Sequence, residues 1–198
     1  MSEALLRSGA AAEARGRLEA FLVSGSGDPR LPRALFLLGQ AREAAGDRAG
    51  ALETYARLTA EYPNAEWTMV ARVAQGRLLR QEGRWAEARE AFERALAGSD
   101  QVAAVEAAFA LGEGYRAQGA HQEATEAYMT AAYLLPDSIW AQRALLGAGL
   151  SFTALKQTES AVIVLRKLLA QPGVEADLAQ QARQALAALG ALPRAEAR

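Results

Sequence analysis

A short pattern of small and bulky residues recurs along this chain at a nearly constant interval. Each copy holds an alanine followed four positions later by a bulky side chain. The alanines are spaced 37, 37, 36 and 37 residues apart and are Ala14, Ala51, Ala88, Ala124 and Ala161. The bulky residues are Leu18, Tyr55, Phe92, Tyr128 and Leu165. A fixed period of this length indicates a solenoid of helical hairpins that stack on one another.

Each copy contains the signals for two helices and a stop between them. In residues 107–136, Ala108, Leu111 and Tyr115 lie three or four positions apart and share one face of a first helix. Gly119 ends this helix, because glycine adopts the left-handed C-cap conformation without a steric penalty. The stop recurs as Gly9, Gly46 and Gly83, and prolines close two copies at Pro63 and Pro136.

A second series of glycines lies inside the expected first helices, at Gly39, Gly76, Gly112 and Gly149. Glycine in a helix interior costs about 1 kcal/mol relative to alanine. Four such glycines at one phase indicate that each leaves room for a partner helix or a bulky side chain. We therefore predict that a larger residue at Gly112 destabilises the fold.

The pattern resembles the tetratricopeptide repeat, which combines a Leu-Gly pair and a tyrosine in its first helix with Ala-x3-Phe in its second. The pair is kept at Leu111 and Gly112, the tyrosine at Tyr115, and the second element at Ala88 and Phe92. The resemblance covers nearly the whole chain. It implies an all-α fold, an α-α superhelix of about eleven helices without strands.

The steps are longer than the roughly 34 residues usual for this family. In this respect the chain resembles tetratricopeptide proteins of bacterial envelopes, such as the Tol-Pal division coordinator and the lipoprotein of the barrel assembly machine. Their repeats carry a Tyr-Pro-Asn-Ser-like turn, and residues 61–65 and 135–138 are similar. The usage of alanine, arginine and glycine also favours a bacterial source.

We predict a single solenoid over residues 1–198. Its parts are a partial repeat over 1–28, full repeats over 30–63, 66–99, 101–136 and 138–172, a capping helix over 174–190 and a tail over 191–198. The first full repeat should have helices near 31–45 and 47–61. The glycine- and serine-rich residues 24–29 are interpreted as a turn between repeats, because the phase continues across them.

The N-terminal end has apolar residues that need cover, since the partial repeat has at most a short first helix over residues 2–8. They are Leu5, Leu6, Leu18, Phe21 and Leu22. Two alternatives follow. Either these side chains cover one another, or this end docks on another copy, on a larger complex or on further repeats.

Composition supplies little chemistry for catalysis or cofactor binding. The chain has no cysteine and one histidine, so it offers no candidate zinc site or catalytic triad, and we expect no cofactor, no metal and no enzymatic activity. A net charge of −1 offers no attraction to nucleic acid or anionic lipid. No signal peptide or membrane-spanning segment is visible, so a cytoplasmic and a periplasmic location both stay open.

Four residues that could suggest a functional site have simpler structural interpretations. Trp67 and Trp140 are 73 residues apart, which is two repeat steps, so both should fill the same structural slot. Trp85 follows a glycine stop and should open a second helix. His121 should be a solvated side chain at the start of a second helix.

The resemblance implies that first helices line a concave groove. The groove residues expected to contact a partner are Arg33, Phe36, Gln40, Glu43, Val73, Arg77, Arg80, Glu106, Phe109, Glu113, Arg116, Arg143 and Leu146. Three further groove positions are Val70, Leu150 and Thr153. Aromatic and arginine side chains of this kind favour a peptide or helix ligand over a small molecule.

We therefore predict a non-enzymatic protein-interaction scaffold that binds a partner peptide or helix in the groove. Apolar burial around Phe36, Val73, Phe109 and Leu146 would supply affinity, and the excess of arginine favours a mildly acidic partner. One alternative is that the groove charges pair only with one another. Another is a structural or assembly subunit of a larger, membrane-associated complex that uses its end or convex faces.

Overall fold

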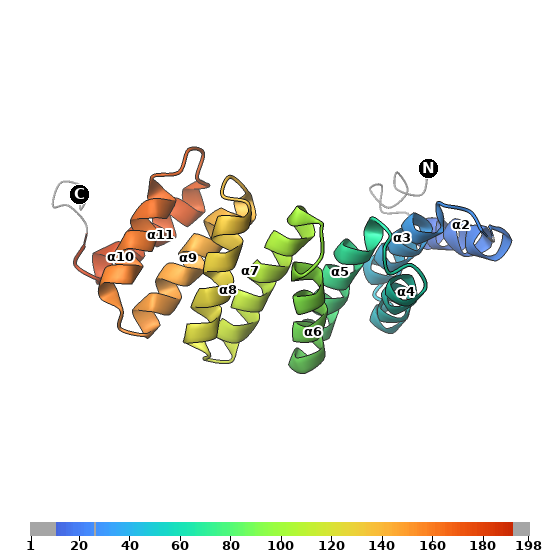
Figure 1. Ribbon diagram of the computed structural model, residues 1–198, viewed down its shortest axis with the longest axis horizontal. Coiled ribbons are helices and arrows are strands. Elements are labelled where there is room, and N and C mark those ends of the chain that lie inside the picture. The colour runs from blue at the N-terminus through green and yellow to red at the C-terminus, as the bar shows by residue number, and fades with distance from the viewer. Residues whose placement is uncertain (1–10, 26, 192–198) are drawn as a thin grey trace. The chain divides into compact units, whose positions relative to one another are not determined.

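The computed structural model describes residues 11–25 and 27–191, and its regular elements are helices (Figure 1). The ten helices of these residues are α2 (Ala11–Ser24), α3 (Leu31–Ala44), α4 (Arg48–Glu61), α5 (Trp67–Gln81), α6 (Trp85–Leu96), α7 (Gln101–Ala117), α8 (His121–Leu134), α9 (Ile139–Ala154), α10 (Thr158–Leu169) and α11 (Ala176–Ala188). The described residues contain no strand. The expected all-α class is confirmed, with ten helices in place of about eleven. The short helix expected over residues 2–8 lies outside the described residues.

The chain falls into two compact units, Met1–Ala95 and Leu96–Arg198. In the second unit α7 packs on α8 and α9, and α9 packs on α8, α10 and α11. In the first unit α3 packs on α2, α4 and α5. Contacts with the next helix and the next but one are typical of stacked hairpins. A single solenoid over the whole chain stays a prediction.

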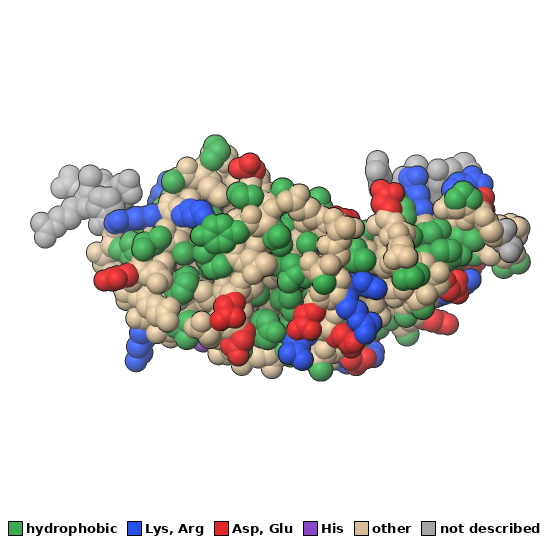
Figure 2. Space-filling model, in the orientation of Figure 1, with side chains coloured by type: hydrophobic (Ala, Val, Ile, Leu, Met, Phe, Trp, Pro, Cys, Tyr) green, Lys and Arg blue, Asp and Glu red, His purple; other side chains and the backbone are tan. Residues whose placement is uncertain are grey.

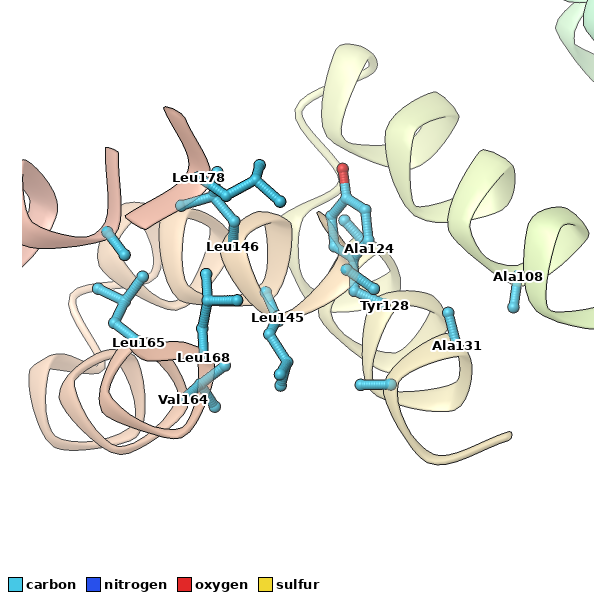
Figure 3. Close-up of a cluster of buried hydrophobic side chains, with 14 of the residues drawn as sticks. Ala108, Ala124, Tyr128, Ala131, Leu145, Leu146, Val164, Leu165, Leu168 and Leu178 are labelled. Carbon is cyan, nitrogen blue, oxygen red and sulfur yellow. The ribbon is translucent and has the colours of Figure 1, made fainter. Parts of the chain in front are cut away.

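The core of the second unit gathers around the ring of Tyr128 (Figure 3). Small residues on the same helix, Ala124 and Ala131, leave room for neighbouring helices, and Leu145 and Leu165 fill the space between α9 and α10. Figure 3 shows Leu178 of α11 beside Leu146 of α9, so the last helix covers the end of this core.

The glycines inside the first helices each lie under a bulky side chain of the following helix. A Cβ added to Gly112 would come 2.5 Å from Cδ1 of Tyr128, and one added to Gly76 would come 2.5 Å from Cε1 of Phe92. Gly39 meets Tyr55 and Gly149 meets Leu165 in the same way. The prediction that these glycines leave room for bulky side chains is therefore confirmed.

Tyr128 is held from two sides. A Cβ on Gly147 of α9 would lie 2.5 Å from Cζ of the same ring. Since Gly112 belongs to α7, the ring is seated between glycines of successive first helices. This explains why Tyr128 is fully buried and why α7 and α9 can approach each other.

The glycine stops take the left-handed conformation that was expected of them. Gly46, Gly83 and Gly119 have φ of 79°, 76° and 74°, while Gly9 lies outside the described residues. At the equivalent place after α9 stands Lys156, with φ of 59°. Its amide donates to the Thr153 carbonyl at 3.0 Å, as the Gly119 amide donates to Arg116. The turn is therefore kept although an L-residue fits it less well.

Gly112→Ala should lower the free energy of unfolding by about 1–2 kcal/mol, because overpacking against the Tyr128 ring outweighs the gain in helix propensity. Gly16 of α2 is the matched control, since a Cβ there meets no atom of residues 11–25 or 27–191 within 4 Å. Gly16→Ala should stabilise the protein by about 0.5–1 kcal/mol. Urea denaturation followed by circular dichroism measures both. Equal shifts for the two variants would contradict the packing role of Gly112.

Lys156→Gly should raise the melting temperature by about 2–4 °C, which corresponds to relief of about 1 kcal/mol in a chain of this size. Lys156→Ala is the control, because it removes the charged side chain but keeps the Cβ. Calorimetry of the three proteins distinguishes the causes. A similar rise in the alanine variant would show that the charge, and not the backbone, is responsible.

Candidate functional site

Two aromatic groups of identical composition occur 73 residues apart, one in each unit. In the first unit the Phe36 ring lies 5.3 Å from Trp67 and 6.0 Å from Tyr55. In the second, Phe109 lies 5.4 Å from Trp140 and 5.9 Å from Tyr128. The expectation that the two tryptophans fill one structural slot is thus confirmed.

Each of these tryptophans also has an arginine over its ring. The Arg33 guanidinium lies 5.6 Å from the ring centre of Trp67, and that of Arg143 lies 5.4 Å from Trp140. These distances are within the range of cation–π attraction. The stacking therefore helps to fix two of the arginines predicted to contact a partner.

Two of the other charged residues predicted to line the groove, Glu113 and Arg116, contact a buried tyrosine. The Tyr128 hydroxyl donates to the Glu113 carboxylate and accepts from Nε of Arg116 at 3.2 Å. Arg116 also forms an ion pair with Glu113 at 3.3 Å. Burial, and after it the hydrogen bond with Glu113, raises the pKa of Tyr128 above its usual range. The hydroxyl therefore stays protonated at neutral pH and acts as a fixed donor.

In the first unit a buried tyrosine, a glutamate and an arginine interact in a similar way, and they come from two successive repeats. The Tyr55 hydroxyl donates to Glu43 at 3.3 Å, and Glu43 lies 3.8 Å from Arg77 of the following first helix. Burial, followed by the charge of Glu43, raises the pKa of Tyr55. Pairing among the groove charges, which was one of the two alternatives, therefore does occur at these residues.

The predicted apolar anchors lie deeper than expected. Val73, Leu146 and Phe36 are only 2%, 6% and 9% exposed, so they pack in the core and offer little surface to a partner. Phe109 is half-buried, and Leu150 is 39% exposed. The predicted contribution of Phe36, Val73, Phe109 and Leu146 to affinity therefore stays a prediction, and Phe109 offers a partner more surface than the other three.

Five of the predicted groove residues meet at one cavity in the second unit, which we call the α9 pocket. Its volume is about 200 Å³, and it lies between α7, α9 and α11. The lining residues are Phe109, Glu113, Arg116, Arg143, Leu146, Gly147, Leu150, Leu178 and Gln181. Leu150 occupies an expected groove position, whereas Glu106 does not line the pocket. Its lining combines apolar side chains with the charged Glu113, Arg116 and Arg143, which we call its rim.

The sequence reasoning missed Leu178 and Gln181 of α11. The sequence predicts this helix only as a cap, and a capping role stays a prediction. Extending the repeat step from α9 by one more interval would have placed α11 next to α9 on the groove side. The periodicity therefore contained the signal.

A larger cavity of about 620 Å³ lies in the first unit between α2 and α3. Leu18 and Phe21, two of the residues expected to need cover, line it together with Arg17 and Arg30. Leu5 and Leu6 lie outside the described residues. Both alternatives for this end of the chain therefore stay open.

Within the described residues the surface carries no group of three or more histidine, aspartate or glutamate side chains that could hold a metal ion. His121 is the first residue of α8 and is half-buried, which corrects the expectation of a solvated side chain. Figure 2 shows acidic and basic side chains interspersed on one face of the molecule. None of the described helices combines the length and the apolar character needed to span a bilayer.

Sequence comparison finds two tetratricopeptide repeat profiles in the chain, one over residues 73–139 and one over residues 33–65 and 143–172. No curated protein sequence matches. Known structures share the fold at low sequence identity. A tetratricopeptide repeat protein from Parabacteroides merdae is 16% identical, with a TM-score of 0.72 over 96% of this chain and 71% of that one.

Two further structures give similar values. BtubC from P. vanneervenii is 17% identical, with a TM-score of 0.71 over 96% of this chain and 85% of that one. MamA from Desulfovibrio magneticus, residue 41 to its end, is 20% identical, with a TM-score of 0.66 over 85% and 89%. Likeness to envelope proteins stays a prediction. The two profiles together cover more than half of the sequence, and the chain belongs to the tetratricopeptide repeat family.

Proposed function

We propose that this protein is a non-catalytic interaction scaffold that holds a segment of a partner protein in the α9 pocket. Tetratricopeptide repeats in general form protein-interaction scaffolds. The observation that carries the specific proposal is the convergence of five predicted groove residues, from α7 and α9, on one cavity. Tyr128, seated between Gly112 and Gly147, holds two of these residues, Glu113 and Arg116.

The size and lining of the pocket favour a protein segment over a metabolite. Pockets for small ligands measure roughly 300–1,000 Å³, whereas the α9 pocket has about 200 Å³. This volume admits one large side chain. The exposed part of Leu150 and the half-buried Phe109 supply apolar contact, and burial of one such side chain contributes about 1.5–3 kcal/mol. Further affinity has to come from contacts along the rim.

Leu150→Asp should strongly reduce partner capture, because it places a carboxylate among the apolar lining residues of the pocket without removing a buried side chain. Ile163→Asp is the matched control, since Ile163 of α10 is 67% exposed and does not line the pocket. Affinity capture from the source cells, with mass spectrometry of the proteins retained by each variant, is the measurement. Wild-type capture by Leu150→Asp would exclude the α9 pocket as the binding site.

The double variant Arg77→Glu, Arg80→Glu tests the predicted preference for an acidic partner in the first unit. Both arginines are exposed on α5, and reversing them should abolish capture of an acidic segment that extends along the first helices. Arg48→Glu with Arg57→Glu on α4 changes the net charge equally and serves as control. If the two double variants capture equally well, Arg77 and Arg80 have no part in binding.

An assembly role on the second-helix face is the alternative that a specific observation favours. Tyr133 of α8 is 64% exposed and Ile163 of α10 is 67% exposed. Nζ of Lys167 lies 4.3 Å from the Tyr133 ring, so these side chains can form one surface patch. The experiment above also decides this case, because loss of capture by Ile163→Asp alone would place the interface on that face.

A further inference from the structure

We infer that α11 forms one wall of the binding site. Glu175, the residue before α11, pairs with Arg143 at the place where an acidic group of the partner would otherwise bind. This inference rests on the proposed function of the α9 pocket. It assigns to the pocket an extended segment that carries one large aliphatic or aromatic side chain and, within a few residues of it, an aspartate or glutamate.

The last helix is held firmly enough to serve as a wall. Leu178, Ala182 and Leu186 are buried against the core of the second unit. Leu178 belongs both to that core and to the lining of the pocket, so the position of the wall is coupled to the packing of α9. Gln181, one turn further on, is exposed and reaches the rim.

The two arginines of the rim, Arg116 and Arg143, differ in how firmly they are already paired and so in how readily a ligand can bind them. Arg116 has two partners, the Tyr128 hydroxyl and the Glu113 carboxylate, and the pair with Glu113 is neutral as a whole. Arg143 lies over the Trp140 ring and has Glu175 at 3.9 Å. The Arg143 and Glu175 side chains are 41% and 53% exposed, so water and salt weaken this pair. Arg143 is therefore the cation that an incoming carboxylate can capture.

Glu175 imitates that carboxylate. It precedes the first residue of α11 and is brought to Arg143 by the turn at Gly173, which has φ of 68°. A partner carboxylate that pairs with Arg143 has to displace Glu175. Because an exposed ion pair is weak, this competition should lower the affinity for acidic segments by a small factor, about two- to fivefold.

The test uses fluorescently labelled synthetic decapeptides with amidated C-termini, so that a terminal carboxylate cannot contribute. Each peptide has one leucine or phenylalanine in a Gly-Ser background, with aspartate, serine or lysine two residues away. Fluorescence anisotropy measures their binding to the full chain at low and high salt. We expect the aspartate peptides to bind most tightly, with a preference that declines in high salt.

Glu175→Gln should strengthen binding of the aspartate peptides about two- to fivefold and leave the serine peptides unchanged. Asp177→Asn is the matched control, since it removes the same charge from the exposed first turn of α11 and should change neither. Arg143→Gln should abolish the preference for aspartate. Equal effects of Glu175→Gln and Asp177→Asn on peptides that bind in the pocket would overturn the role of Glu175.

The failure of this inference can be told apart from failure of the proposed function. If Leu150→Asp binds the leucine and phenylalanine peptides as well as the wild type, or if none of them binds, the α9 pocket is not the site. If Leu150→Asp abolishes binding but aspartate, serine and lysine peptides bind equally, the pocket stands and the acidic preference is overturned. The serine peptide is also made with a free C-terminal carboxylate. Tighter binding of this peptide than of its amidated form would show that Arg143 accepts a terminal carboxylate as well as an aspartate side chain.

Discussion

Contact between a bulky ring and a helix that lacks a Cβ is the interaction on which the rest of this fold depends. In four pairs of successive helices the first helix carries a glycine where the following helix projects a tyrosine, phenylalanine or leucine. The glycine weakens its own helix by about 1 kcal/mol. Burial of a large side chain offsets that loss and brings the two backbones close together. The repeats can stack because this spacing is the same in each.

The same contact positions the charges of the candidate site. Since Gly112 and Gly147 hold the ring of Tyr128 from two sides, its hydroxyl is fixed beside Glu113 and Arg116. Glu113 and Arg116 are ordered by that hydroxyl. Core packing and rim electrostatics are therefore parts of one system.

The period of the sequence was sufficient to predict the hairpins, the glycine stops and the common slot of Trp67 and Trp140. The period could not predict how deeply each side chain is buried, because the position of a residue on a helix face does not show how much of its side chain a neighbour covers. Phe36, for example, lies under Trp67 and is buried, although its phase is that of a groove residue. Lys156 shows that the glycine pattern can also miss a turn, because the left-handed turn is formed there by a lysine.

The two aromatic groups also allow their surroundings to be compared position by position. Leu150 of the α9 pocket stands 73 residues after Arg77, which pairs with Glu43 in the first unit. One position is thus apolar in one unit and charged in the other, while Gly39 and Gly76 recur as Gly112 and Gly149. Gly147, the second glycine against the Tyr128 ring, has Ala74 as its counterpart. Leu146 and Leu178 serve both the core and the pocket, so a change at either would alter packing and binding together. Exposed positions such as 77 and 150 differ between the two units while the glycines at 39 and 112 do not, so an exchange of side chains at such positions can alter the ligand with little effect on the fold.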